Sequence, residues 1–135
     1  MTHAITSLQG ALVAALNGDA ALTGLIGTNA VVDAPPKGMT PPYVAIARHD
    51  VVSRDADLAP GQEHRMVLQV WHSEANRRAL LEIVEHVVAV ATTAELSGAE
   101  LVVTLARHVR TETQIDGKTG RARAAVMLRF LSEAG

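Results

Sequence analysis

The segment GQEHRMVLQVWHSEANRRALLEI, residues 61–83, contains the change of periodicity that decides the fold. Its first half carries apolar side chains on both faces of an alternating pattern, with Met66 on one face and Val67 and Trp71 on the other. This alternation predicts a β-strand from Glu63 to His72. Because both faces are partly apolar, the strand is expected to lie inside the sheet and not at its edge.

The second half of the segment predicts a helix, because its apolar residues recur every three or four positions. Ser73 is the expected N-cap, and the helix is expected to run from Glu74 to about Thr92. Its apolar stripe would pack on the sheet and would leave Glu82 and Glu85 for solvent or for a partner.

Two helices are expected before this segment. The first begins near Ile5 and stops at Asn17-Gly18, and Asp19 caps a second, which ends at Gly27. Three hydroxyl side chains could cap the first helix: Thr2, Thr6 and Ser7.

Proline pairs in DAPPKGMTPPYVAI, residues 33–46, separate a short edge strand at Val31-Val32 from the next strand. Proline fixes φ and lacks an N–H, so the chain is expected to form a rigid connector that cannot join a ladder before Tyr43. A strand then runs from Tyr43 to Asp50. Residues 51–62, rich in Asp, Pro and Gly, are expected to form a projecting loop.

The C-terminal third predicts a long hairpin. Two β-rich runs, about Leu101 to Thr113 and Arg121 to Ser132, are joined by QIDGKTG, in which Asp-Gly is a strong turn signal. The order of elements indicates one α+β domain over residues 1–135. It is a two-layer sandwich with a largely antiparallel sheet of four or slightly more strands and helices packed on one face.

Composition excludes several classes of function. The chain has 135 residues, 48% of them apolar, and only three aromatic side chains, so base stacking on an aromatic platform is not expected. The net charge of −2 gives no electrostatic footprint for binding nucleic acid or an anionic membrane. Cysteine is absent, which excludes disulfides and thiolate chemistry. The N-terminus lacks the layout of a signal peptide, and no apolar run is long enough to span a bilayer.

Motifs that would carry chemistry fail in their context. DGKTG resembles the end of a phosphate-binding loop, but Glu112 stands where the first glycine belongs, and both flanks read as strand. The HSE at residues 72–74 lacks the cysteines of a zinc deaminase. Asp55 and Asp57 begin a calcium-loop spacing that Ala59 and Pro60 then interrupt.

Six histidines leave one catalytic alternative open. His49 and His64 flank the 51–62 loop and could face each other across a strand pair. However, there is no helical H-x-x-x-H spacing and no convincing third ligand. One function that these histidines leave open is therefore that of a small metal-dependent or hydrolytic cytoplasmic enzyme that uses them. A third possibility, a ligand-binding module, is disfavoured because three aromatic residues cannot line a pocket.

Charged residues of the hairpin, the loop and the long helix form a candidate protein–protein interface. Arginine alternating with alanine and valine on long strands suits a surface that docks against acidic neighbours. The candidate residues are Arg54, Asp55, Asp57, Glu82, Glu85, Arg107, Arg110, Asp116, Lys118, Arg121, Arg123 and Arg129.

Three stretches in this order resemble a known family: LQGALVAALNGDAALTGLIG (8–27), VVDAPPKGMTPPYVAIARHD (31–50) and the opening segment, 61–83. The chain resembles the tail terminator, tail-completion or head–tail joining proteins of tailed phages, prophages and gene transfer agents. The resemblance extends over nearly the whole chain, to the R-F-L strand around Phe130.

The resemblance implies a structural virion protein without catalysis or cofactor. It implies a homohexameric ring at the head–tail junction, made in the host cytoplasm, that caps the tail tube, stops its polymerisation and joins the tail to the head connector. The expected partners are other copies of the chain, the tail-tube protein and the head-connector (stopper or adaptor) protein. DNA is expected only as passing cargo, with no membrane partner. In this reading the 51–62 loop is an arm toward an adjacent ring.

Overall fold

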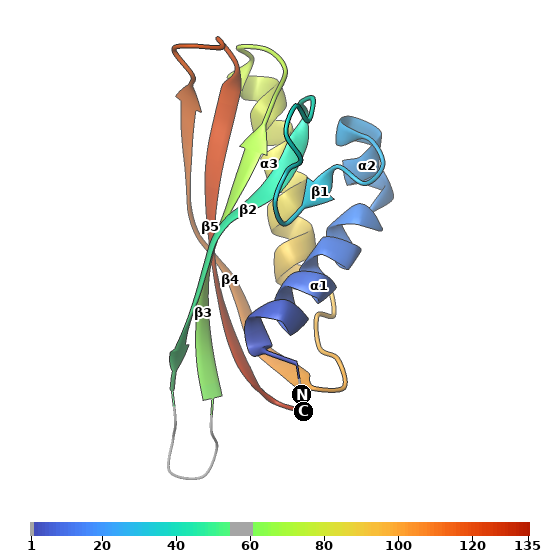
Figure 1. Ribbon diagram of the computed structural model, residues 1–135, viewed down its shortest axis with the longest axis vertical. Helices are drawn as coiled ribbons and strands as arrows, with labels where there is room; N and C mark the ends of the chain where they lie inside the picture. Colours follow the sequence, from blue (N-terminus) through green and yellow to red (C-terminus); the bar gives the residue numbers. More distant parts are fainter. Residues whose placement is uncertain (1, 55–60) are drawn as a thin grey trace.

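Five strands form one sheet in the computed structural model of the protein, which describes residues 2–54 and 61–135 (Figure 1). Three helices accompany them. In chain order the elements are α1 (Ala4–Asn17), α2 (Ala20–Ile26), β1 (Val31–Val32), β2 (Tyr43–Ser53), β3 (Gly61–Trp71), α3 (Arg77–Thr93), β4 (Leu101–Ile115) and β5 (Ala122–Ala134).

The strand order is β1-β2-β3-β5-β4. The short β1 pairs with β2 in parallel, and the other three pairings are antiparallel. The sheet is thus largely antiparallel, as predicted, and β3 is interior, as its two partly apolar faces indicate. β5 is interior as well, so β4 alone of the two hairpin strands has a free edge.

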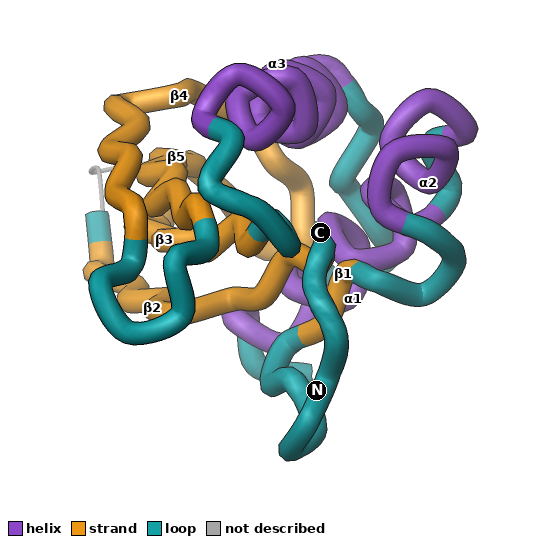
Figure 2. The backbone as a smooth tube through the Cα atoms, turned by 90° about the horizontal axis from the view of Figure 1, so that it is seen from above, coloured by secondary structure: helices purple, strands orange, loops and turns teal. Residues whose placement is uncertain are grey.

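All three helices cover one face of this sheet, which gives the predicted two-layer α+β arrangement (Figures 1 and 2). Between the layers lies a core of aliphatic side chains around Phe130, with Leu8 and Leu12 from α1 and Leu80 and Val87 from α3 fully buried. Burial of side chains of this size is worth about 1.5–3 kcal/mol each. Within the described residues, no helix lies on the opposite face of the sheet.

The helix caps correct two predictions. The N-cap of α1 is His3, whose Nδ1 accepts the Ile5 N–H, and not a hydroxyl side chain. The N-cap of α3 is Asn76 and not Ser73. The reason is that the Glu74 carbonyl accepts the Ala122 N–H, so this stretch is still tied to β5 and the helix begins later. Asp19 caps α2 as predicted.

The strands on either side of the predicted 51–62 loop are longer than expected. Val51 pairs with His64 and Ser53 with Gln62, so both ends of that loop belong to the β2–β3 ladder. The pairing of β2 with β3 continues through Val51, Val52 and Ser53, and the β-branched side chains of the two valines favour this longer strand. The centre of the predicted loop, 55–60, lies outside the described residues.

The proline-rich connector ends where the sequence indicates. β2 begins at Tyr43, and the Val44 N–H donates to the Ala30 carbonyl just before β1. The prediction of a brief strand at Val31–Val32 is confirmed. In the described part of the chain, no helix has both the length and the apolar character to cross a bilayer.

Candidate assembly interface

The sheet face that carries no helix is the candidate interface, and it is called the outer face below. Met66 and Leu68 of β3 point into the core, so alternation places their neighbours Arg65 and Val67 on the outer face. The cross-strand register extends this assignment, because Arg65 pairs with Arg129 of β5, which in turn pairs with Arg107 of β4.

The outer face is rich in charge and more basic than acidic. Its alternating positions carry six arginines: Arg48 (β2), Arg65 (β3), Arg107 and Arg110 (β4), and Arg123 and Arg129 (β5). Four carboxylates accompany them: Asp50, Glu63, Glu112 and Glu133.

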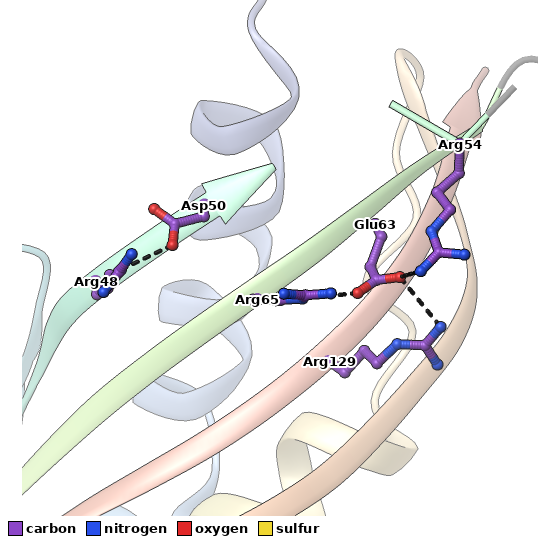
Figure 3. Close-up of polar contacts among 6 residues, drawn as sticks. All are labelled: Arg48, Asp50, Arg54, Glu63, Arg65 and Arg129. Carbon is purple, nitrogen blue, oxygen red and sulfur yellow. Dashed lines mark hydrogen bonds and ion pairs between the residues drawn. The ribbon is translucent and has the colours of Figure 1, made fainter. Parts of the chain in front are cut away.

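Glu63 is the centre of this charge arrangement (Figure 3). Its side chain is almost fully buried, with a relative exposure of 2%, although it lies on the outer face. Three guanidinium groups enclose it: Arg54 Nη2 at 2.6 Å, Arg65 Nε at 2.8 Å and Arg129 Nη2 at 3.2 Å. Beside this cluster, Arg48 Nε donates to Asp50 Oδ2 at 2.7 Å.

The arginines hold Glu63 in its charged form. The hydrogen bond from Arg65, followed by that from Arg129, lowers the pKa of Glu63 from 4.5 to about 2. One carboxylate against three guanidinium groups leaves the cluster positively charged at neutral pH. A surface with this charge is complementary to acidic side chains of another protein.

A depression of about 540 Å³ lies over this region. Its lining includes the apolar residues Val67, Val109 and Met127, together with charged side chains of β2, β3 and β5. Val109 belongs to the irregular stretch of β4 between His108 and Arg110 and is 58% exposed. An apolar floor within a charged rim is the usual anatomy of a protein–protein contact.

The histidines singled out in the sequence lie on the inner face of the sheet. His49 Nε2 and His64 Nδ1 are 2.8 Å apart, which confirms that the two face each other across β2 and β3. Gln9 of α1 contacts His49 Nδ1 at 3.2 Å, and His64 Nε2 contacts Ser132 Oγ at 2.8 Å. The result is a polar chain that links α1 to three strands.

Both histidines of this polar chain are held neutral. Burial, followed by the charge of His64, lowers the pKa of His49 to about 4, and burial also lowers the pKa of His64. In one consistent arrangement the Gln9 amide donates to His49, His49 donates to His64, and His64 donates to Ser132. Within residues 2–54 and 61–135 no group of three or more His, Asp or Glu side chains could hold a metal ion. In the polar chain the two histidines contact each other, and Gln9 and Ser132 contact its two ends.

The structure brings together only part of the predicted interface. Arg54 and Arg129 meet at Glu63, and Arg107 lies opposite Arg129 in the ladder. Arg110 pairs with Glu112 at 2.7 Å. Two of the predicted residues, Asp55 and Asp57, lie outside the described residues.

Arg123 is engaged within its own chain. It donates to Gln114 at 2.7 Å and lies 5.2 Å from the ring centre of Trp71, the residue opposite it on β3. This cation–π contact and hydrogen bond fix the arginine on the outer face.

The remaining predicted residues lie elsewhere. Glu82 and Glu85 are exposed on α3, in the helix layer. Three others lie in the connection between β4 and β5: Asp116, Lys118 and Arg121. Asp116 accepts the Thr119 N–H and hydroxyl, contacts that lower its pKa, so it stabilises the turn.

Sequence reasoning missed Glu63, Arg65 and Arg48 as parts of the interface. A signal was present, because Glu63 and Arg65 are two residues apart on a predicted strand and so share a face. Their partner Arg129 could not be assigned, since the sequence does not reveal that β5 lies between β3 and β4.

Comparisons with known proteins agree with this fold. The family model described as "Tail completion protein gp17" matches residues 10–133. A solved structure titled "Virion of native gene transfer agent (GTA) particle" contains a chain with a TM-score of 0.85 and 25% sequence identity. The match covers 98% of this chain and 99% of that one. No curated protein sequence matches.

The fold and these matches define the class of the protein: it is a structural component of a virion tail, of the phage or gene transfer agent type. Within that class, the chain belongs to the tail completion protein gp17 family.

Proposed function

We propose that this chain assembles into a homohexameric ring that caps the tail tube, ends its polymerisation and joins the tail to the head connector. The ring has no catalytic role and uses no cofactor. Its neighbours are the tail-tube protein on one side and the head-connector protein on the other, and DNA passes through the ring only as cargo.

The observation that carries this proposal is the separation of charge between the two layers of the fold. The helices and their connections, residues 2–42 and 72–100, contain an excess of acidic side chains. The acids are Asp19, Asp33, Glu74, Glu82, Glu85, Glu95 and Glu100; the bases are Lys37, Arg77 and Arg78. Strands β2–β5 carry the opposite excess, since six arginines accompany four carboxylates.

A protomer with an acidic helix layer and a basic outer face can associate head to tail, with the front of one copy against the back of the next. Contacts of this heterologous kind produce closed rings when the rotation between copies closes. Six copies is the number that the resemblance to tail terminators implies. The family and the charge separation together favour a ring over an isolated monomer.

The test is deletion of the gene in a phage or gene transfer agent that encodes the chain, followed by complementation with the wild-type sequence. Electron microscopy then measures tail length and the fraction of tails joined to heads. We expect tails of irregular length, separate from heads, without the protein, and normal particles on complementation. Normal tails joined to heads in its absence would contradict the proposal.

A further inference from the structure

Helix α3 carries an exposed apolar residue in an acidic setting. Leu81 is 39% exposed, and it stands next to Glu82 and one turn before Glu85, both exposed. Residues 81 and 85 share one side of the helix because they are four positions apart. Arg77 and Arg78 lie in the first turn of α3, before this stretch. The charged residues within 81–85 are Glu82 and Glu85, so the stretch itself is acidic.

The depression on the outer face has the complementary composition. Val67, Val109 and Met127 supply apolar surface, and the charged lining consists of Arg48, Arg54, Arg65 and Arg129 with Asp50 and Glu63. Four guanidinium groups and two carboxylates give the depression a charge of about +2 at neutral pH. Glu82 and Glu85 together carry about −2.

The guanidinium groups at the rim keep donors for a partner. Arg65 contacts Glu63 through Nε, and Arg48 contacts Asp50 through Nε. Their side chains remain 66% and 72% exposed. Because guanidinium carries five N–H donors, each can form a second, bidentate contact with a carboxylate.

We propose that the stretch 81–85 of α3 in one copy docks into this depression in the next copy, with Leu81 on the apolar floor and the two glutamates on the arginine rim. This inference rests on the proposed ring and names the two surfaces that meet in it. The two surfaces lie on opposite layers of the protomer, so the contact cannot be two-fold symmetric and extends from copy to copy. Leu81 supplies apolar burial at the centre, and the surrounding charges set orientation and exclude other registers.

The absence of cysteine from the chain allows a direct test by cross-linking. Leu81→Cys and Val109→Cys are introduced together, both at exposed positions, and assembled particles are treated with a short bismaleimide. Purified protein at high concentration is treated in the same way. We expect a ladder of covalent multimers on a denaturing gel. Each protomer then has one cysteine, at position 81, in its contact with one neighbouring copy and a second, at position 109, in its contact with the other neighbour, so it can be cross-linked to both.

Matched variants make the outcome specific. Each single-cysteine variant should remain monomeric on the gel, and so should Leu81→Cys with Val102→Cys, since Val102 is also exposed, at 39% against 58% for Val109, but lies outside the depression. Dimers from Leu81→Cys alone would indicate a two-fold contact and overturn the inference. The absence of a ladder in both particles and purified protein would overturn it as well.

Failure of the inference and failure of the proposed function are distinguishable. Particles with tails of normal length that give no ladder contradict this pair of surfaces but leave the capping function intact. Normal tails in the deletion strain contradict the function itself.

Discussion

Glu63 on β3 and Arg129 on β5 are joined by a 3.2 Å hydrogen bond on the sheet face that carries no helix. The sequence predicts that Arg129 contacts a neighbouring chain, but this bond shows that Arg129 already has a partner within its own chain. Arg123 is similarly engaged with Gln114 and Trp71. Replacing these two arginines therefore tests the fold before it tests an interface.

Arg129→Glu is expected to lower the stability of the isolated protein markedly. It places a carboxylate against the buried Glu63 and removes one of its three cations. We expect Tm to fall by roughly 10 °C. The matched control is Arg107→Glu, directly opposite on β4, for which Tm should change by about 2 °C or less because Arg107 is exposed and has no ion pair within the described residues. Equal melting of both variants would show that the Glu63 cluster does not stabilise the fold.

Stability is expected to fall as pH drops from about 6.5 toward 4. The pKa of His49 is about 4 in the folded protein and near 6.5 when unfolded, so the unfolded state binds more protons in this window. The stabilisation is complete above the unfolded value and is lost as pH falls toward the folded one. Urea denaturation at successive pH values measures it.

His49→Gln is the control for this pH dependence, because it removes the titrating ring and keeps hydrogen-bonding capacity toward Gln9 and His64. The slope of unfolding free energy between pH 6.5 and 4 should become shallower. A slope identical to that of the wild type would exclude His49 as its origin. The carboxylate of Glu63 affects stability at lower pH. Its pKa is about 2 in the folded protein and near 4.5 when unfolded, so the stability that it contributes is lost only as pH falls below about 4.5.

Chelation should have no effect on the protein. The polar chain from Gln9 to Ser132 pairs both histidines with each other and with neighbouring side chains. We therefore expect Tm and particle assembly to be unchanged by EDTA, with controls in matched buffer. Stoichiometric zinc retained through gel filtration would instead revive the enzyme alternative.

The sequence predicts element types and order well because these depend on local periodicity. The switch from alternating to helical spacing near Ser73 identifies β3 and α3, and Asp-Gly identifies the β4–β5 hairpin. Boundaries are less accurate, because tertiary contacts set them. The bond between the Glu74 carbonyl and the Ala122 N–H delays the start of α3, a contact between residues 48 positions apart that no local pattern contains.

The candidate interface is less predictable for the same reason. Arginine on a strand is visible in the sequence, but its partners depend on strand order. Once β5 lies between β3 and β4, Glu63 meets Arg129, and Arg107 is aligned with Arg129 and, across β5, with Arg65. The contact between His49 and His64 could be foreseen because both lie on consecutive strands that pair antiparallel.

Arg107→Glu is expected to impair assembly while leaving the fold intact. Arg107 lies next to the depression, opposite Arg129, and its reversal weakens the attraction for the acidic stretch of α3. The fraction of capped, head-joined tails should fall severalfold. Lys118→Glu, at the exposed turn of the hairpin, reverses the same amount of charge at a distant position and should have a smaller effect. If the two variants impair assembly equally, net charge and not the outer face determines assembly.

Cryo-electron microscopy of the head–tail junction tests the proposed ring most directly. Particles carrying the wild-type chain should show, between the tail tube and the head connector, a ring of six copies. In that ring the outer sheet face of each copy should lie against α3 of the next. A ring absent from that position, or one with another number of copies, would contradict the proposed assembly.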